Sequence, residues 1–461
     1  MNLNDYNHYY FLGIGGIGMS AIARYLKSMG CDVAGYDRVR SELCMELEKE
    51  GIPINYLDQV GSIPDVLKLP KLLGGPILII YTPAIPPESQ QLNYFKNNGY
   101  RLFKRSQILG LITEDSFNIS VAGTHGKTTT SSLIAHLLNS AGKPFGAFLG
   151  GISTNLGSNY FNTNIPRTKA ITVTEADEFD RSFLTLSPNL AVITSMDADH
   201  LDIYGTGEEL QKSFFDFITR IEAGGTLFLK FGLPAPSVEN ISIKTYGIDK
   251  GNYRASNIHI DEGWFVFDLD TETERWTGLR LGIPGIHNIE NAVAAIAVCL
   301  QLGIAREAIT EGLKSFQGVK RRFEFICREP GFTFIDDYAH HPAELEAFIR
   351  SVRLLYPHEK ITGVFQPHLY SRTRDFAPQF AKSLSLLDEA ILLDIYPARE
   401  QPMEGVSSEL IFGEISAEQK HLITKENLVG LLKDLRPRIL LTMGAGDIDT
   451  LVSPIKNALL S

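Results

Sequence analysis

The sequence predicts an α/β protein built from three successive domains. Segments with β-strand character alternate with amphipathic helical segments along most of the 461 residues, a pattern typical of parallel sheets covered by helices. Two glycine-rich turns, near residues 13 and 123, each join a strand to a helix. The chain is also long enough for two or three domains with separate cores. We expect the domains to span residues 1–108, 109–318 and 319–461.

Composition restricts the classes of protein to which the chain can belong. Hydrophobic residues make up 44% and charged residues 21%, as in ordinary soluble domains. The net charge of −11 argues against general nucleic-acid binding. The sequence shows no signal peptide and no apolar run of about 18 residues, the length a membrane helix needs. Its four cysteines are scattered, as in a reducing compartment. We expect a cytoplasmic monomer or homodimer without nucleic-acid or membrane partners.

Residues 8–105 predict the first parallel sheet. The strand-like stretches are YYFLGIG, DVAGYD and GPILIIYTPAI, and the helix-like stretches are MSAIARYLKSMG, SELCMELEKEG and PESQQLNYFKNNG. Residues 13–18 read G-I-G-G-I-G, and Asp37 ends the next strand. This order is the fingerprint of a Rossmann-like domain, whose first turn holds a diphosphate at a helix N-terminus. The candidate ligand-binding residues are Gly15, Gly16, Ile17, Gly18 and Asp37.

The second domain begins with a phosphate-binding signature. The strand NISVAG runs into a glycine turn, and the helix KTTTSSLIAHLLNSAG leaves it. Glycines let the backbone wrap around phosphate oxygens, Lys127 supplies a charge for the β- and γ-phosphates, and the hydroxyl of Thr128 or Thr129 can bind Mg²⁺. The match is imperfect, because Val121 stands where the first glycine of the motif belongs. We predict a P-loop ATPase-like domain with these nucleotide-binding residues: Gly123, Thr124, His125, Gly126, Lys127, Thr128 and Thr129.

Acidic side chains follow two later strands of this domain. The stretch KAITVTEAD ends with Glu175 and Asp177, and Glu178 and Asp180 follow it. The stretch LAVITSMDADH ends with Asp197, Asp199 and His200, and Asp202 follows it. Open α/β sheets bind ligands at such strand ends. We choose Glu175, which follows its strand directly, and His200 as divalent-metal ligands. Solvated acidic loops are the alternative.

Two further segments offer contacts for a nucleotide. GIPGIHNIENAVAA places Asn288 and Asn291 at a helix start, where they can read a nucleobase edge, although Asn288 could simply cap the helix. GVKRRFEFI brings Lys320, Arg321 and Arg322 together, as a phosphate contact or a solvated hinge.

The third domain repeats the α/β pattern and predicts a second Rossmann-like sheet. Its strand-like stretches are FTFIDDYA, ITGVFQPH, EAILLDIYPA and RILLTMGAGD. The first is followed by Asp336, Asp337, His340 and His341, and the second by His368, Arg372 and Arg374. Adjacent histidines point their rings apart, which favours a nucleotide or substrate contact over a metal site. Arginines suit two-pronged binding of a carboxylate.

Taken together, these motifs resemble the Mur ligase family. AGTHGKTTT, EADEFDRSFL, DADHLD, GIHNIENAVAA, RRFEF, DDYAHHP, FQPHLYSRTRDF and MGAGDI occur in the family's order and cover all three predicted domains. The resemblance implies an ATP- and Mg²⁺-dependent ligase with an N-terminal UDP-binding domain. GIGGIGMSAIA and FQPHLYSRTRDF are most similar to members that join L-alanine to UDP-N-acetylmuramate through an acyl phosphate. Members that recycle murein tripeptide share HHP and are the alternative.

The resemblance also implies roles for individual residues. Gly126, Lys127 and Thr128 match the phosphate loop, Glu175 and His200 the Mg²⁺ ligands, Asn288 and Asn291 the adenine contacts, Arg322 and Asp337 nucleotide contacts, and His340, His368 and Arg372 the amino-acid and acyl-phosphate region. The implied catalytic set is Lys127, His200, His340, His368 and Arg372. Phe215 stands where later-step members have a carbamylated lysine, and Leu369 where many relatives have a basic residue.

Two other functional classes remain open at this point. A nicotinamide oxidoreductase would use the N-terminal fingerprint, but the second phosphate loop counts against it. A nucleotide sensor without catalysis would keep both loops. With ATP assigned to the loop at Lys127, we expect the turn at residues 13–18 to hold the diphosphate of a UDP-sugar. Because motifs for one site occur in all three predicted domains, we also expect domain movement to enclose the acceptor.

Overall fold

The computed structural model describes residues 3–68, 77–163, 170–197, 201–398 and 400–460. These residues form two compact units. The first unit comprises Met1–Ala255, Leu269–Trp276 and Asn291–Leu313, and the second comprises Ser256–Asp268, Thr277–Glu290 and Lys314–Ser461.

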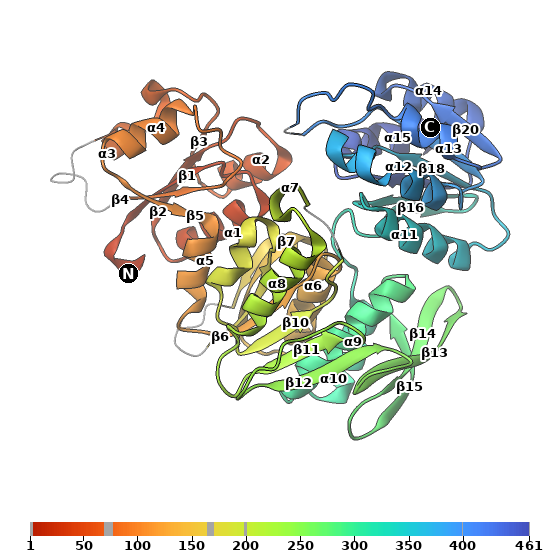
Figure 1. The fold of residues 1–461 in the computed structure, drawn as a ribbon, viewed down its shortest axis with the longest axis horizontal. Helices are drawn as coiled ribbons and strands as arrows, with labels where there is room; N and C mark the ends of the chain where they lie inside the picture. Colours follow the sequence, from red (N-terminus) through yellow and green to blue (C-terminus); the bar gives the residue numbers. More distant parts are fainter. Residues whose placement is uncertain (1–2, 69–76, 164–169, 198–200, 399, 461) are drawn as a thin grey trace. The chain divides into compact units, whose positions relative to one another are not determined.

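The N-terminal sheet is parallel and has the strand order β3-β2-β1-β4-β5 (Figure 1). Its strands are β1 (His8–Leu12), β2 (Asp32–Tyr36), β3 (Ile54–Asn55), β4 (Ile77–Tyr81) and β5 (Arg101–Lys104). The helices are η1 (Leu3–Asp5), α1 (Ile17–Ser28), α2 (Glu42–Lys49), η2 (Val60–Ser62), α3 (Asp65–Lys68), α4 (Gln90–Asn97) and α5 (Arg105–Thr113). This strand order is that of a Rossmann-like half, which confirms the predicted fold.

Alternation along β1 explains why helices cover both faces of this sheet. Tyr9 and Phe11 belong to the core shared with α1, whereas Tyr10 lies in a second core with Phe95 of α4. Successive side chains of a strand point to opposite faces, so an apolar strand such as HYYFL needs a partner layer on each side.

The central sheet has the strand order β15-β14-β13-β12-β11-β10-β6-β9-β7-β8. Its strands are β6 (Phe117–Ala122), β7 (Phe145–Ser153), β8 (Ser158–Asn162), β9 (Ile171–Ala176), β10 (Leu190–Ile193), β11 (Thr226–Lys230), β12 (Ser242–Ile248), β13 (Tyr253–Asp261), β14 (Trp264–Asp270) and β15 (Arg275–Leu281). The helices are α6 (Lys127–Ser140), η4 (Phe179–Thr185), α7 (Leu201–Tyr204), α8 (Gly207–Ile218), α9 (Ile286–Gln301) and α10 (Arg306–Ser315).

Helix α6 is the central helix of the first unit. Every residue from Thr128 to Leu138 is buried, so the helix that begins at the phosphate loop is held on all sides. Strands β10, β6 and β9 run parallel beside it and end together at that loop. The antiparallel hairpin of β7 and β8 has no counterpart in the sequence-based expectation; its glycine-rich first strand has little of the β-branched character that marks strands.

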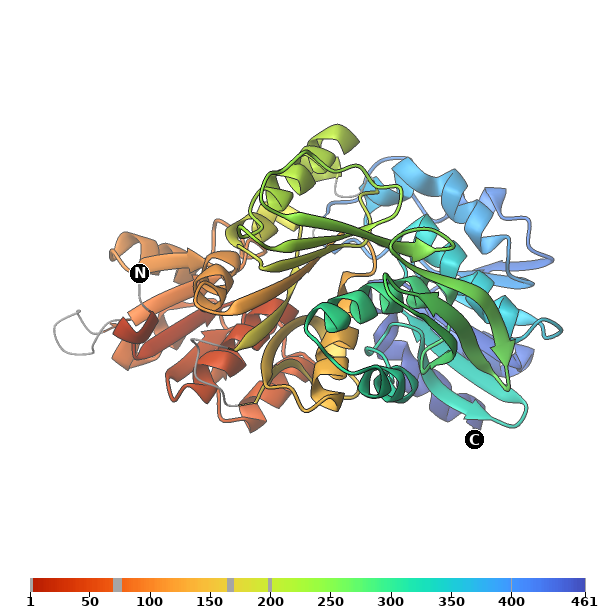
Figure 2. The ribbon, with the colours of Figure 1, turned by 90° about the horizontal axis from the view of Figure 1, so that it is seen from below.

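The C-terminal sheet has the strand order β16-β17-β21-β18-β19-β20, parallel except for β16 with β17. Its strands are β16 (Glu324–Glu329), β17 (Phe332–Asp337), β18 (Ile361–Phe365), β19 (Glu389–Leu392), β20 (Gln419–Leu422) and β21 (Ile439–Met443). The helices are α11 (Pro342–Leu355), α12 (Tyr370–Leu384), α13 (Glu409–Glu414), α14 (Lys425–Leu435), η5 (Asp447–Leu451) and α15 (Val452–Leu460). One core packs α11, α12 and α13 on one face, and another packs α14 and α15 on the other, in teal to blue in Figures 1 and 2.

Among the described residues, the structure contains no helix that is both long and apolar enough to span a membrane.

Candidate active site

The N-terminal glycine turn has the geometry of an anion-binding loop. Strand β1 ends at Leu12, Gly13 takes a φ of 86°, and α1 begins at Ile17. Asp37 shapes this turn, because its carboxylate accepts the N–H of Gly15 at 2.8 Å and that of Val39 at 3.0 Å. The ligand contact expected of Asp37 stays a prediction, and in the structure its carboxylate orders the turn.

An arginine that the sequence motifs did not single out lies against this turn. A Cβ atom on Gly18 would lie 2.7 Å from a terminal guanidinium nitrogen of Arg105, the first residue of α5. The same guanidinium is 3.2 Å from a carboxylate oxygen of Asp177. A cation at the positive end of a helix is electrostatically unfavourable, and the carboxylate of Asp177 compensates it here. Arg105 therefore lies where it would meet an anion bound at the turn.

The phosphate loop joins β6 to α6 through two glycines with positive φ. Gly123 has a φ of 136° and Gly126 a φ of 81°, and both are closely packed. The hydroxyl of Ser195, which follows β10, accepts the N–H of His125 at 2.7 Å and lies 2.8 Å from the hydroxyl of Thr124. The loop is therefore rigid before any nucleotide binds.

Asn291 belongs to the same cluster. A Cβ atom on Gly126 would lie 2.6 Å from the amide oxygen of Asn291, so the structure brings together these two residues that the sequence predicted separately. Asn288 lies in the second unit, where its side-chain amide donates to the carbonyl of Pro284 at 2.5 Å. Because α9 begins at Ile286, Asn288 is inside the helix rather than its N-cap.

Lys127 is paired with a carboxylate that the sequence alone did not identify. Its ammonium group lies 2.8 Å from one oxygen of Glu178 and 3.0 Å from the other, and it also donates to the carbonyl of Thr124. Glu178 belongs to the predicted acidic run, but that run offers four carboxylates and no local signal distinguishes the one that meets the lysine.

The electrostatics of this pair are set by burial. The side chain of Glu178 is fully buried, which raises its pKa to about 7, although the charge of Lys127 acts in the opposite direction. Burial lowers the pKa of Lys127, but the carboxylates of Glu178, Glu175 and Asp177 outweigh that effect and raise it. Lys127 is thus a cation at neutral pH.

The structure describes two of the three residues expected to hold Mg²⁺, Thr128 and Glu175. Glu175 was expected directly after its strand but is the penultimate residue of β9, which extends one residue further, to Ala176. Its carboxylate accepts the N–H of Gly150 at 3.1 Å. Thr128 lies buried in the first turn of α6. These hydroxyl and carboxylate oxygens are ligands that Mg²⁺ prefers.

His200 lies outside the described residues. No group of three His, Cys, Asp or Glu side chains suited to a metal occurs within the described ranges, but Mg²⁺ commonly keeps several waters and needs only one or two carboxylates.

In the second unit, Asp337 and Arg322 are electrostatically coupled. Asp337 accepts the N–H of Phe323 and of Ala339, each at 2.7 Å. Burial raises the pKa of the Asp337 carboxyl to about 7, and the nearby charge of Arg322 partly offsets this rise. Arg322 also lies 3.7 Å from a carboxylate oxygen of Glu344.

The predicted histidines of the second unit are neighbours. The rings of His340 and His368 have centroids 6.1 Å apart, and Tyr396 stacks on His368 at 5.8 Å. His341 instead contacts Phe376, so the adjacent histidines have different surroundings, as expected. Tyr396 follows β19 and was not predicted, because only tertiary packing brings it to His368.

Arg372 lies in the first turn of α12 and is 7% exposed. The helix is preceded by Leu369 with a φ of 70°, a backbone conformation that L residues rarely adopt and that marks a constrained position. The N–H of Leu369 donates to the carbonyl of Tyr396 at 3.0 Å. This bond ties the start of α12 to the ring that stacks on His368.

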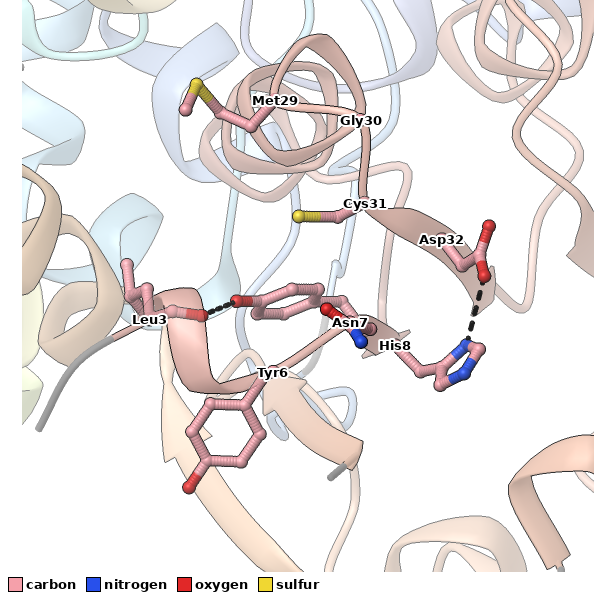
Figure 3. A pocket seen from close by; sticks show the side chains of 9 residues that line it. Leu3, Tyr6, Asn7, His8, Met29, Gly30, Cys31 and Asp32 are labelled. Carbon is pink, nitrogen blue, oxygen red and sulfur yellow. Dashed lines mark hydrogen bonds and ion pairs between the residues drawn. The ribbon is translucent and has the colours of Figure 1, made fainter. Parts of the chain in front are cut away.

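A cavity of about 420 Å³ lies elsewhere (Figure 3). It is lined by Leu3, Tyr6, Asn7, His8, Tyr9, Met29, Gly30, Cys31 and Asp32. His8 and Asp32, which form an ion pair at 3.2 Å, begin β1 and β2, so the cavity is at the amino edge of the sheet. Ligands of open α/β sheets bind at the opposite, carboxyl edge, where the predicted residues are.

The Asp337 carboxyl makes stability depend on pH. Its pKa of about 7 in the folded protein exceeds the ordinary value of 3.8, so between these values the folded state keeps a proton that the unfolded chain has released. Its contribution is fully present below about pH 4 and is lost as pH rises through about 7. We expect the melting temperature of Asp337→Asn minus that of wild type to increase from pH 4 to pH 8, because only wild type loses this contribution as pH rises. A constant or opposite difference would contradict this assignment.

Three family profiles match consecutive parts of the chain. They are described as "Mur ligase family, catalytic domain" for residues 8–116, "Mur ligase middle domain" for residues 121–299 and "Mur ligase, glutamate ligase domain" for residues 321–446.

Full-length relatives carry a more specific name. A UDP-N-acetylmuramate–L-alanine ligase of Flavobacterium psychrophilum is 48% identical over 460 residues, which cover 100% of this chain and 99% of the relative. The ligase of the same name from Christiangramia forsetii is 48% identical over 462 residues, with the same coverage. Among crystal structures, UDP-N-acetylmuramate-alanine ligase from Thermotoga maritima superposes with a TM-score of 0.80 at 28% identity and 98% coverage of both chains. A murein peptide ligase from Psychrobacter arcticus has the same fold, with a TM-score of 0.71, 21% identity and coverage of 98% and 99%.

Proposed function

The chain belongs to the Mur ligase family, and on that premise we propose that it joins L-alanine to the carboxylate of UDP-N-acetylmuramate while ATP is converted to ADP and phosphate. The observation that carries this proposal is the full-length similarity to relatives named for that activity. The nicotinamide alternative for the N-terminal fingerprint falls away, because the family is one of ligases. The fingerprint describes a diphosphate site, and a UDP-sugar supplies the diphosphate.

We assign ATP to the loop of residues 123–126 and the start of α6. The N–H groups at the helix start and the charge of Lys127 neutralise phosphate oxygens. Asn291, which lies beside Gly126 in the structure, is the proposed adenine contact. Thr128, Glu175 and His200 are the proposed Mg²⁺ ligands. The ion supplies charge neutralisation on the phosphates when it is bound.

The proposed reaction has two steps and needs no covalent enzyme intermediate. A carboxylate oxygen of UDP-N-acetylmuramate attacks the γ-phosphorus of ATP, ADP leaves, and an acyl phosphate forms. The uncharged amine of L-alanine then attacks the acyl carbon, and the tetrahedral intermediate expels phosphate and loses a proton to give the amide. Lys127 stabilises the charge on the transferred phosphoryl group. We propose that Arg372 binds a carboxylate in this reaction, with His340 and His368 beside it.

A substrate panel tests the proposal. Phosphate release from ATP is measured with UDP-N-acetylmuramate and, in turn, L-alanine, glycine, L-serine and the murein tripeptide. We expect release with L-alanine that depends on UDP-N-acetylmuramate. Release that ignores UDP-N-acetylmuramate would refute the proposal, and preference for the tripeptide would identify a recycling ligase. Nucleotide binding without any release would point to a sensor.

Arg105 gives a prediction for the diphosphate site. We expect Arg105→Gln to raise the KM for UDP-N-acetylmuramate about tenfold, because a charge-assisted hydrogen bond is worth about 1.5–3 kcal/mol, while the KM for ATP stays unchanged. Arg101→Gln is the matched control, since this exposed arginine bonds Tyr6 instead. Calorimetry with UDP alone locates the contact. Weaker binding of UDP places Arg105 at the diphosphate, and unchanged binding of UDP places it at the sugar carboxylate.

We also propose a cytoplasmic location, because none of the four cysteines Cys31, Cys44, Cys299 and Cys327 forms a disulfide in the structure, as is usual in a reducing compartment. Whether the enzyme is a monomer or a homodimer is to be measured by light scattering.

A further inference from the structure

A buried polar junction joins α1 to β8. The side chain of Asn159 on β8 is fully buried. Its amide nitrogen donates to the carbonyl of Ile17 and to the hydroxyl of Ser20 at 2.9 Å, both in the first turns of α1. Its amide oxygen accepts from Arg24, one further turn along the helix. One side chain therefore binds the very start of the helix that follows the diphosphate turn.

Arg24 extends this junction to α2. It is 8% exposed, and its guanidinium is bound in a two-pronged manner by the carboxylate of Glu50, at 2.7–3.0 Å, with Glu46 at 3.3 Å. Buried polar networks whose members are all hydrogen-bonded favour one arrangement over its neighbours, because any shift leaves a desolvated group without a partner.

Apolar contacts lie beside the polar junction. Tyr25 of α1 packs edge-on against Phe148 of β7 at 5.6 Å and against Tyr160 of β8 at 6.0 Å. Such edge-on pairs are favoured by the ring quadrupoles and hold α1 on the hairpin. The hydrogen bonds of Asn159 add contacts to the first turns of α1 itself.

The other strand of this hairpin touches the proposed metal ligand. The N–H of Gly150 on β7 donates to the carboxylate of Glu175 at 3.1 Å. A Cβ atom on Gly150 would overlap that carboxylate, so only glycine allows the approach. The pairing of β7 with β8 is irregular between Phe148 and Ser153, and such bulges re-aim a strand beside active sites.

We propose that the β7–β8 hairpin sets the position of the diphosphate-binding turn relative to Glu175, with Asn159 as the positioning residue. This inference rests on the proposed function. A UDP-sugar held at its diphosphate must present its carboxylate in line with the γ-phosphate held near Glu175. A displacement of about 1 Å between the two sites costs about 10²-fold in rate, so the spacing between them is part of the catalytic apparatus.

The test separates binding from reaction. In Asn159→Ala and the milder Asn159→Ser, we expect kcat to fall at least about tenfold, because the reacting groups are misaligned. The dissociation constant for UDP, which lacks the reacting carboxylate, should stay within about twofold, as should the KM for ATP. A purely structural role would lower the melting temperature but leave kcat unchanged well below it. Ser28→Ala is the matched control, since it removes an exposed hydrogen bond between the same elements, from Ser28 to Tyr160.

Each outcome distinguishes the inference from the function on which it rests. Wild-type protein that releases no phosphate with UDP-N-acetylmuramate and L-alanine overturns the proposed function. Active wild type with a kcat in both Asn159 variants equal to that of Ser28→Ala overturns the inference alone. Loss of UDP binding in parallel with kcat also overturns it, because Asn159 would then shape the turn itself. Should Asn159→Ala fail to fold, Asn159→Ser decides.

Discussion

Replacing Lys127 by alanine is expected to lower ATP-dependent ligation by about 10³-fold, the order of magnitude for removing a preorganised charge from a phosphoryl-transfer site. Lys127 is the cation of the candidate phosphate loop, and the structure pairs it with the buried carboxylate of Glu178. The measurement is phosphate release at saturating UDP-N-acetylmuramate and L-alanine.

The control for this variant lies just beyond the other end of the same helix. Lys143 follows the C-terminal end of α6 and is exposed, so Lys143→Ala should retain wild-type activity. Lys127→Ala also leaves the buried carboxylate of Glu178 without its partner, which destabilises the fold. The double variant Lys127→Ala/Glu178→Gln removes that unpaired charge. It should recover the melting temperature and stay inactive, whereas recovery of activity would show that Lys127 acts only on stability.

Gly126→Ala is expected to weaken binding of ADP by more than about 10²-fold, because a side chain strains the left-handed backbone of Gly126 and either the loop or the amide of Asn291 must shift to admit the methyl group. Gly126 takes a φ of 81°, and its Cβ would lie 2.6 Å from the amide oxygen of Asn291. Displacing backbone N–H groups that cradle a phosphate removes several charge-assisted hydrogen bonds at once.

The matched control is Gly142→Ala at the other end of α6. Gly142 has a φ of 62°, and open space surrounds the site of its Cβ. Gly142→Ala introduces the same backbone strain of about 1–2 kcal/mol but no close contact such as that between Gly126 and Asn291. Its melting temperature should therefore fall below that of wild type, while its affinity for ADP should stay unchanged. Calorimetric titration with ADP compares the two. Equal affinities would mean that the loop does not hold the nucleotide as proposed.

Much of the fold follows from short-range patterns in the sequence. Strands such as residues 8–12 and 117–122 are continuous apolar runs because both faces of their sheets are covered. Glycines mark both loops because positive φ is required there, as at Gly13 and Gly126. The β7–β8 hairpin escaped prediction, since it lacks the alternation and composition by which strands are recognised.

The sequence by itself determined the α/β class, the two glycine turns and the family, because glycine spacing, apolar periodicity and motif order are local properties of the chain. Only the tertiary structure decided which charges meet. Lys127 and Glu178 are 51 residues apart, Arg105 and Asp177 are 72 apart, and Ile17 and Asn159 are 142 apart. The physical reason is that periodicity determines which face of an element is apolar, whereas the partner of a buried polar group depends on how distant elements pack.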